Sequence, residues 1–146
     1  MDEPDKERLA SLLRKNHRRL RASATIEAWS SRNVSVSRVS GDHQEQMLSD
    51  LREWRGGEYE HVADVVALLH GFSGDASVVV VADWNANEEP ALMVPTTALC
   101  RSEGDLHRLY PDGLVVWTEL AALIIDFDHE TGEVRACRYE RAGALG

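Results

Sequence analysis

The stretch LVVWTELAALIIDFDHETGEVRACRY, residues 114–139, decides the fold. Within it, two largely apolar runs, residues 123–128 and residues 133–139, flank a short acidic segment that ends in Gly132. Such a segment suits a four-residue hairpin loop built on a type I turn, in which the glycine adopts the positive φ that closes the loop. We therefore predict an antiparallel hairpin, with the Asp128 side chain accepting hydrogen bonds from backbone amides of the turn.

The turn also fixes the register of the predicted hairpin. It places Phe127 opposite Val134 and Asp126 opposite Arg135, the second pair as a cross-strand ion pair. Because successive side chains of a strand point to opposite faces, one face of the hairpin is apolar and is expected in the core. That face carries Leu123, Ile125, Phe127, Val134 and Ala136, with Arg138 at its far end.

The same turn contains several possible metal ligands, namely Asp126, Asp128, His129 and Glu130. An EF-hand calcium loop requires a glycine directly after its third acidic ligand and a bidentate glutamate further along. Thr131 occupies the glycine position, and no glutamate follows at the required distance. We interpret the segment as an acidic hairpin turn and predict no metal or other cofactor.

The composition indicates one globular, cytoplasmic protein. The 146 residues are 43% hydrophobic and 28% charged, which allows a real core and excludes a disordered chain. The longest apolar run covers residues 120–125, far less than a membrane span needs, and the acidic N-terminus does not resemble a secretory signal. Two cysteines, Cys100 and Cys137, are too few for a disulfide scaffold and suit a reducing compartment.

Charge is distributed unevenly along the chain. Residues 1–41 contain nine Lys/Arg and five Asp/Glu, a net charge of +4, whereas residues 42–146 contain seven and twenty, a net charge of −13. We therefore divide the chain into a basic helical segment, residues 1–41, possibly with a short hairpin, and an acidic α+β domain, residues 42–146. An acidic body argues against general nucleic-acid binding and favours a basic protein partner, although ordinary soluble proteins are also often acidic.

The basic segment is predicted to begin as a helix over residues 4–21. Its leucines form one narrow stripe that either docks on the body or pairs with a second helix. The basic run at residues 14–21 either contacts an anionic surface, such as phosphate or membrane, or leans on the acidic body of the chain itself. The period changes over residues 22–29, so either the helix continues with a rotated buried face or a hairpin of residues 24–29 with 33–39 begins.

The acidic domain is predicted to contain two helices before its sheet. Asp42, with Glu45 completing a capping box, is expected to start a helix over residues 43–54. A second, mostly apolar helix is expected over residues 59–70, ended by Gly71. The second helix has no Lys or Arg and would make a poor DNA-recognition helix.

The remaining segments complete an α+β fold, in which N-terminal helices precede a mainly antiparallel sheet of about five strands. Residues 77–84 form a strand buried on both faces, residues 85–90 a polar loop, and residues 91–94 a returning strand. A short helix around residues 102–109 and a turn at residues 110–113 then lead into the hairpin region.

The best candidate for an exposed anchor is Trp84, which lies at a strand end beside the polar loop; burial in the core is the alternative. The candidate binding residues are this tryptophan, its loop and the basic run: Trp84, Asn85, Asn87, Glu88, Glu89, Arg14, Arg18, Arg19 and Arg21.

No sequence motif indicates catalysis. The segment around Ser73 reads G-x-S-G, which is not the nucleophile elbow of α/β-hydrolases, and no histidine pair has zincin spacing. A small enzyme is the alternative, with a site assembled in space from some of Asp126, Asp128, His129, His107 and Cys100. A tether to membrane or nucleic acid through the basic helix is a further alternative.

We predict a non-enzymatic cytoplasmic protein that binds a protein partner. Negative charge without a catalytic motif suits a toxin-neutralising immunity protein or an accessory protein of a mobile element, such as one that serves plasmid transfer.

Overall fold

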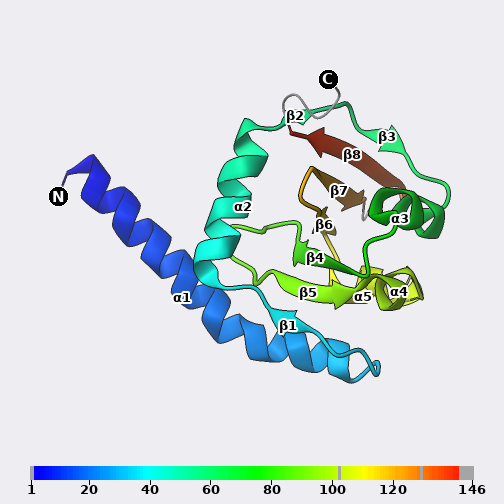
Figure 1. Cartoon of the computed structure of the whole chain (residues 1–146), viewed down its shortest axis with the longest axis horizontal. Helices are drawn as coiled ribbons and strands as arrows, with labels where there is room; N and C mark the ends of the chain where they lie inside the picture. Colours follow the sequence, from blue (N-terminus) through cyan, green and yellow to red (C-terminus); the bar gives the residue numbers. More distant parts are fainter. Residues whose placement is uncertain (1, 102, 129, 142–146) are drawn as a thin grey trace.

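A computed structural model describes residues 2–101, 103–128 and 130–141, with the backbone alone for residues 103–105. A long N-terminal helix precedes a mainly antiparallel sheet, so the α+β prediction is confirmed (Figure 1). Among the described residues, no helix is long and apolar enough to cross a membrane.

The first helix, α1 (Glu3–Ser30), is longer than the sequence analysis predicted. It continues through the segment whose period changes, so the hairpin alternative for residues 24–29 is wrong. The physical reason is Trp29, which is fully buried and donates its indole N–H to the Tyr110 hydroxyl at 3.1 Å. The helix rotates its buried face toward this contact, and Asn33 follows with a positive φ of 62°.

The second helix, α2 (Gly41–Glu53), has a different cap from the one predicted. Ser40 is the N-cap, because its hydroxyl accepts a hydrogen bond from the His43 N–H at 3.1 Å. Asp42 instead lies in the first turn and forms an ion pair with Lys15 at 2.7 Å. The capping-box prediction is therefore wrong, and Glu45 is directed to another partner, described below.

The predicted helix over residues 59–70 is also displaced. Residues Glu60–His61 form a short strand, β3, and α3 occupies Val65–Ser73. Asp64 caps α3 by accepting from the Ala67 N–H at 3.0 Å, and Gly71 lies inside the helix rather than ending it. Tyr59 consequently lies in an extended segment beside β8 instead of on a helix.

The described strands form one antiparallel sheet in the order β1-β5-β4-β6-β7-β8-β2, with β3 also paired to β8. Five of them are the strands that the sequence predicted: β4 (Val78–Asp83), β5 (Leu92–Pro95), β6 (Gly113–Trp117), β7 (Ala121–Phe127) and β8 (Val134–Glu140). The others are two-residue strands: β1 (Ser37–Arg38), β2 (Arg55–Gly56) and β3.

The β7–β8 hairpin has the predicted register. Phe127 pairs with Val134 and Asp126 with Arg135. Gly132 has a φ of +73°, and Asp128 Oδ1 accepts from the N–H groups of Glu130 and Thr131. These two hydrogen bonds are also the first causes that lower the pKa of Asp128 below its ordinary value. His129 lies outside the described residues.

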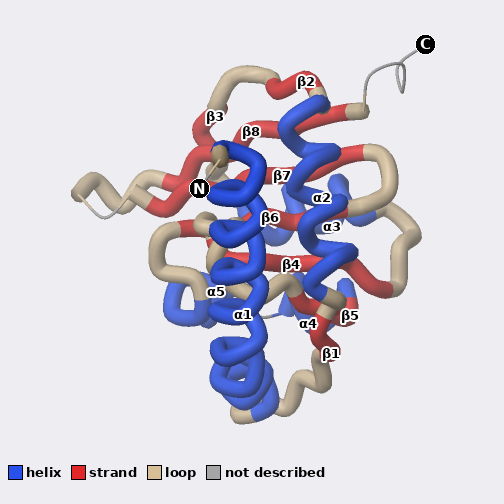
Figure 2. The backbone as a smooth tube through the Cα atoms, turned by 90° about the vertical axis from the view of Figure 1, so that its left-hand side faces the viewer, coloured by secondary structure: helices blue, strands red, loops and turns tan. Residues whose placement is uncertain are grey.

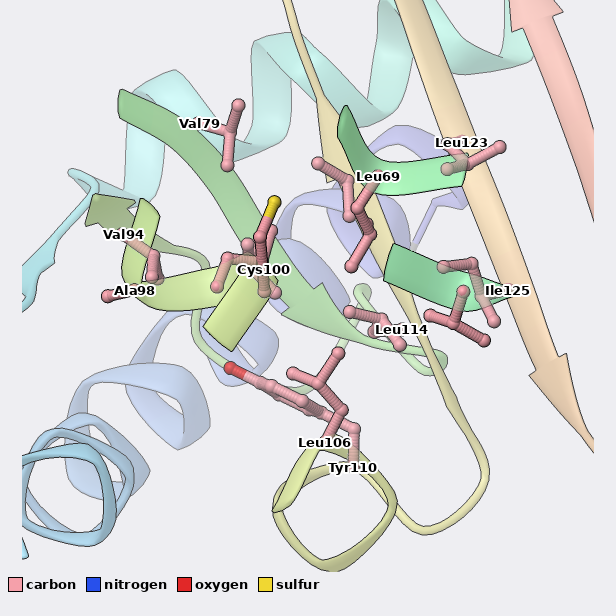
Figure 3. Packing of buried hydrophobic residues seen from close by; sticks show 14 of the residues in the cluster. Leu69, Val79, Val94, Ala98, Cys100, Leu106, Tyr110, Leu114, Leu123 and Ile125 are labelled. Carbon is pink, nitrogen blue, oxygen red and sulfur yellow. The ribbon is translucent and has the colours of Figure 1, made fainter. Parts of the chain in front are cut away.

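The sheet is covered on both faces. Figure 2 shows α1 and α2 in front of the strands, and the opposite face carries α3, α4 (Thr96–Arg101) and α5 (Glu103–Leu109). The larger core lies under α3–α5 and includes the predicted apolar face of the hairpin; Figure 3 shows part of it around Leu69, Cys100 and Ile125. A smaller core under α2 includes Trp117 and Ala122. Because β4 contributes to both cores, its predicted burial on both faces is confirmed.

Candidate functional site

The basic run of α1 meets the polar loop after Trp84 at a buried contact. The Arg18 side chain is fully buried, and its guanidinium donates to Glu45 Oε1 at 2.6 Å and to the Asn87 carbonyl at 2.9 Å. A buried charge is tolerated only when it is paired and hydrogen-bonded, and these two acceptors supply the ion pair and a second hydrogen bond, while Arg18 Nε has no hydrogen-bond partner among the described residues. Arg18 therefore joins α1 to α2 and to the loop.

The loop itself is held by Gln44 of α2, which is 2% exposed. Its amide nitrogen donates to the Ala86 and Glu89 carbonyls, both at 2.7 Å, and its amide oxygen accepts from the Ala91 N–H at 2.9 Å. Three backbone groups of residues 86–91 are thus satisfied by a single side chain. Through these hydrogen bonds the polar loop connects α1, α2 and the sheet.

The other predicted binding residues lie either at this contact between α1, α2 and the loop or on the solvent-exposed surface. Arg21 pairs with Glu89 at 3.3 Å. Arg19 is exposed and donates to the Asn16 side chain at 3.0 Å, and Asn85 donates to Glu88 at 3.3 Å. Arg14 is half-buried. The structure thus brings the basic run and the acidic loop together, which the sequence alone left as one of two alternatives.

Trp84 lies at the end of β4 with 40% of its surface exposed, and it contacts a second exposed aromatic residue. Its ring centroid lies 6.3 Å from that of Tyr59, which is 42% exposed, with 45° between the ring planes. This separation is within the range of favourable aromatic pairs. The sequence pattern placed Tyr59 on a helix and so gave no reason to pair it with Trp84; the preceding Gly56-Gly57 pair indicates a break in regular structure but not an extended segment.

Trp84, directly after β4, begins a row of opposed residues that crosses the sheet through β6 and β7 to β8. The Trp84 N–H donates to the Gly113 carbonyl at 3.0 Å, Gly113 pairs with Asp126, and Asp126 pairs with Arg135. Directly opposed residues share a face of the sheet, so Trp84, Asp126 and Arg135 lie on the α2 side. Tyr59 lies on that side too, because the β3–β8 register sets it opposite Cys137, which is paired with Ile124 of the smaller core. We call these four side chains, Tyr59, Trp84, Asp126 and Arg135, the aromatic surface.

The electrostatics of the aromatic surface keep Tyr59 neutral. Partial burial is the main cause that raises the pKa of Tyr59 to about 12, followed by the neighbouring Cys137, Tyr139 and Asp126. Arg135 lies 3.8 Å from one carboxylate oxygen each of Asp126 and Asp128. At physiological pH the surface therefore presents a phenol donor, an indole and a shared ion pair.

A recess lies on the same side of the sheet, beneath α2, with a volume of about 710 Å³. Its lining is mainly apolar and includes Met47, Trp54, Val80, Met93 and Leu120. We call it the α2 groove. Two of these residues, Met93 and Leu120, are 41% and 56% exposed, so the groove is open to solvent. No sequence pattern indicates it, because residues of five separate elements, α2, α3, β4, β5 and β6, and of the segments that connect them line it.

Among the described residues of the enzymatic alternative, Cys100 and His107 lie on the α3–α5 side of the sheet, whereas Asp126 lies on the α2 side. Cys100 is buried in the larger core, where burial raises the pKa of its thiol, whereas the His107 ring packs edge-on against Phe127 at 5.0 Å. Asp126 and Asp128 are paired with Arg135 on the α2 side of the sheet and its adjoining turn. In the part of the chain that the structure describes, no three His, Cys, Asp or Glu residues are grouped to hold a metal ion.

The burial of both cysteines leads to a testable expectation for thiol chemistry. Cys100 and Cys137 are 4% and 2% exposed, and burial raises the pKa of each thiol. Because the thiolate is the reactive form, both should react with an aromatic disulfide reagent at pH 8 at least about a hundredfold more slowly in the native protein than in guanidinium. A native thiol that reacts at the unfolded rate would contradict this burial and would favour a cysteine enzyme.

No protein-family model matches this chain, and a search of curated proteins finds no match either.

Proposed function

We propose that the protein is a non-enzymatic module that binds a protein partner through the aromatic surface. The observation that supports this most strongly is the exposed Tyr59–Trp84 pair. Its members come from separate segments, and their ring centroids lie 6.3 Å apart. Tyrosine and tryptophan are enriched among the residues that dominate protein interfaces, because they bury a large area at a small entropic cost. The pair rests on a sheet, so a partner would meet a preorganised anchor.

The charges around the aromatic pair suit a basic partner. Glu88 is exposed in the loop that follows Trp84. Glu58 and Glu60 flank Tyr59 in the chain and are exposed, but strand alternation directs them to the α3 side, where both line a recess. Glu88, together with the net charge of −13 over residues 42–146, would steer a basic protein toward the surface. The partner chemistry is therefore a basic, folded protein with a recess for one or two aromatic side chains.

Within that proposal, we place the protein in the cytoplasm, as a toxin-neutralising immunity protein or as an accessory protein of a mobile element. An acidic surface with an aromatic anchor would block a basic toxin by covering its substrate-binding or nucleic-acid-binding face. The geometry of Cys100, His107 and the Asp126–Arg135 pair offers no comparable support for an enzyme.

The proposal is tested by affinity capture from the host lysate with the tagged wild type and with Trp84→Ala and Tyr59→Ala, at low and high salt. We expect one basic protein near stoichiometric recovery, a marked loss at high salt, and at least about tenfold weaker binding by each variant. Circular dichroism of each variant verifies that the fold is retained.

Met93→Ala is the matched control, because Met93 is exposed to almost the same extent as Trp84 but lines the α2 groove. It should capture the partner as the wild type does. Equal capture by all variants, or loss with Met93→Ala alone, would contradict the assignment of the aromatic surface.

A further inference from the structure

The outer face of α1 carries leucines that the fold leaves uncovered. Leu9, Leu12, Leu13 and Leu20 are 45%, 53%, 60% and 67% exposed. Leu9 lies about 180° around the helix from Arg18, the buried residue that joins α1 to the body. The leucine stripe therefore faces away from the body, so of its two predicted roles docking on the body is wrong; Arg18, Ala22 and Trp29 are the buried residues of α1.

The first half of α1 also stands clear of the body. Residues 2–9, 12 and 13 are exposed, and Figure 1 shows this part of the helix extending away from α2 and the sheet. Isolated helices of this length are marginal in water, and most of their stability in proteins comes from packing of an apolar face. An exposed leucine stripe on a projecting helix is the usual mark of an interaction site.

We propose that this stripe, defined by Leu9, Leu12, Leu13 and Leu20, pairs antiparallel with the same stripe of a second copy, so that the protein forms a two-fold dimer. The spacing supports helix pairing, because Leu9, Leu13, Asn16 and Leu20 follow one another at four, three and four residues. Such spacing occupies the two seam positions of a heptad repeat. Arg18 then occupies the position farthest from the seam, so each body lies on the far side of its helix.

Charge complementarity within the chain selects a second copy as the occupant. When Leu9 of one copy lies level with Leu13 of the other, Leu12 meets Leu12 at the two-fold axis. The same register brings Asp5 beside Arg19 of the second copy on one flank. It also brings Glu3 beside His17 of the second copy on the other flank. Six leucines, three from each copy, then form the centre, and the Asp5–Arg19 ion pair and the Glu3–His17 contact each occur twice.

The parallel arrangement lacks these pairings. In parallel helices a flanking residue meets the residue five positions further along the second copy. Asp5 would then meet Ala10, and Arg19 would meet Ala24, so neither charge gains a partner. In this antiparallel register Leu20 lies level with Asp2 at the start of the second copy's helix, so Leu20 lies at the edge of the contact and the six central leucines form most of it.

Sedimentation of the full-length protein over a roughly hundredfold range of concentration, up to about 200 µM, tests the dimer. We expect a reversible monomer–dimer equilibrium, and Leu13→Glu should weaken it at least about tenfold, because two buried leucines are replaced by charges. Leu120→Glu is the control: Leu120 has a similar exposure but lies on the β6–β7 connection, and this variant should dimerise normally. A wild type that is monomeric throughout would overturn the proposal.

The orientation is tested by charge reversal and cross-linking. Asp5→Arg and Arg19→Asp should each weaken association roughly three- to tenfold, and the double variant should recover the wild-type constant. With a short bis-maleimide, Leu12→Cys should cross-link to itself. Asp5→Cys should cross-link only when mixed with Arg19→Cys, and the wild type, whose own cysteines are buried, should not react. Self-cross-linking of Asp5→Cys would indicate a parallel pair and overturn this arrangement.

Dimerisation through α1 is independent of the proposed function. Trp84→Ala should leave the monomer–dimer equilibrium unchanged, and Leu13→Glu should still capture the partner, although with lower avidity. Failure of one proposal is therefore distinguishable from failure of the other.

Discussion

Replacing Gly113 by alanine should lower the free energy of unfolding by about 4 kcal/mol or more, enough to abolish the folded state of a marginally stable domain. Gly113 has a φ of +126°, a backbone conformation that residues with a side chain rarely adopt. A Cβ atom at this position would overlap the backbone carbonyl oxygen of Ile125 on β7. Because the obstacle is backbone inside a paired sheet, it cannot move away without breaking the β6–β7 ladder.

Gly71→Ala is the matched control for this prediction. Gly71 lies inside α3, and a Cβ atom there meets nothing within 4 Å. Alanine is the better helix former, so this variant should be about 0.5–1 kcal/mol more stable than the wild type. Urea unfolding of both variants measures the effects, and a Gly113→Ala protein as stable as Gly71→Ala would show that the description of the Trp84–Gly113–Asp126 row is wrong.

Replacing Arg18 by alanine should cost about 2–4 kcal/mol of stability. The change removes the two hydrogen bonds by which Arg18 joins α1 to the body and leaves the Glu45 carboxylate, which is 20% exposed, without its cation. The partial exposure of Glu45 allows water to compensate in part, so the expected cost is below that of a fully buried pair. The midpoint of urea unfolding reports the change.

Arg19→Ala serves as the comparison, because it removes the same side chain one position away. Arg19 is exposed and contacts only Asn16 among the hydrogen bonds described above. Its replacement should change stability by less than about 0.5 kcal/mol. If the two variants are equally stable, Arg18 does not join α1 to the body, and it would return to the set of candidate anion-binding residues.

The contrast between Arg18 and Arg19 shows that the sequence alone does not predict which arginine of the basic run is buried. Both belong to one basic run, and the helical period alone shows that they point in different directions. It does not show which direction the body occupies. The leucine stripe left two alternatives, docking on the body or pairing with a second helix, because an apolar stripe suits either role. The acceptors for Arg18 come from residues 27 and 69 positions away, Glu45 and the Asn87 carbonyl, so only the fold brings them together.

Local patterns were more informative in the sheet. The register of the β7–β8 hairpin follows from its turn and alternation, since both depend on neighbouring residues. The predicted helix over residues 59–70 was partly wrong, because a contact between residues distant in the sequence decides its first part. Its apolar periodicity was real for α3, but pairing of β3 with β8, which lies more than 70 residues later, overrode it at Glu60 and His61. For that reason the sequence did not identify Tyr59, one of the two aromatic residues of the aromatic surface.

The α2 groove and the aromatic surface illustrate the same limit for sites. Each is assembled from elements that are distant in the sequence, and neither contains a motif. Trp84 was recognised because a tryptophan at a strand end beside a polar loop is unusual. Its partner, Tyr59, and the opposed Asp126–Arg135 pair became neighbours of Trp84 only through the strand order.

Hydrogen–deuterium exchange on the complex with the captured partner tests the central claim most directly. If the aromatic surface binds the partner, amides of residues 57–61 and 83–88 should gain protection in the complex, while those lining the α2 groove around Met47 and Met93 should not change. Protection confined to the α2 groove or to α1, with the Tyr59 and Trp84 segments unchanged, would contradict the account.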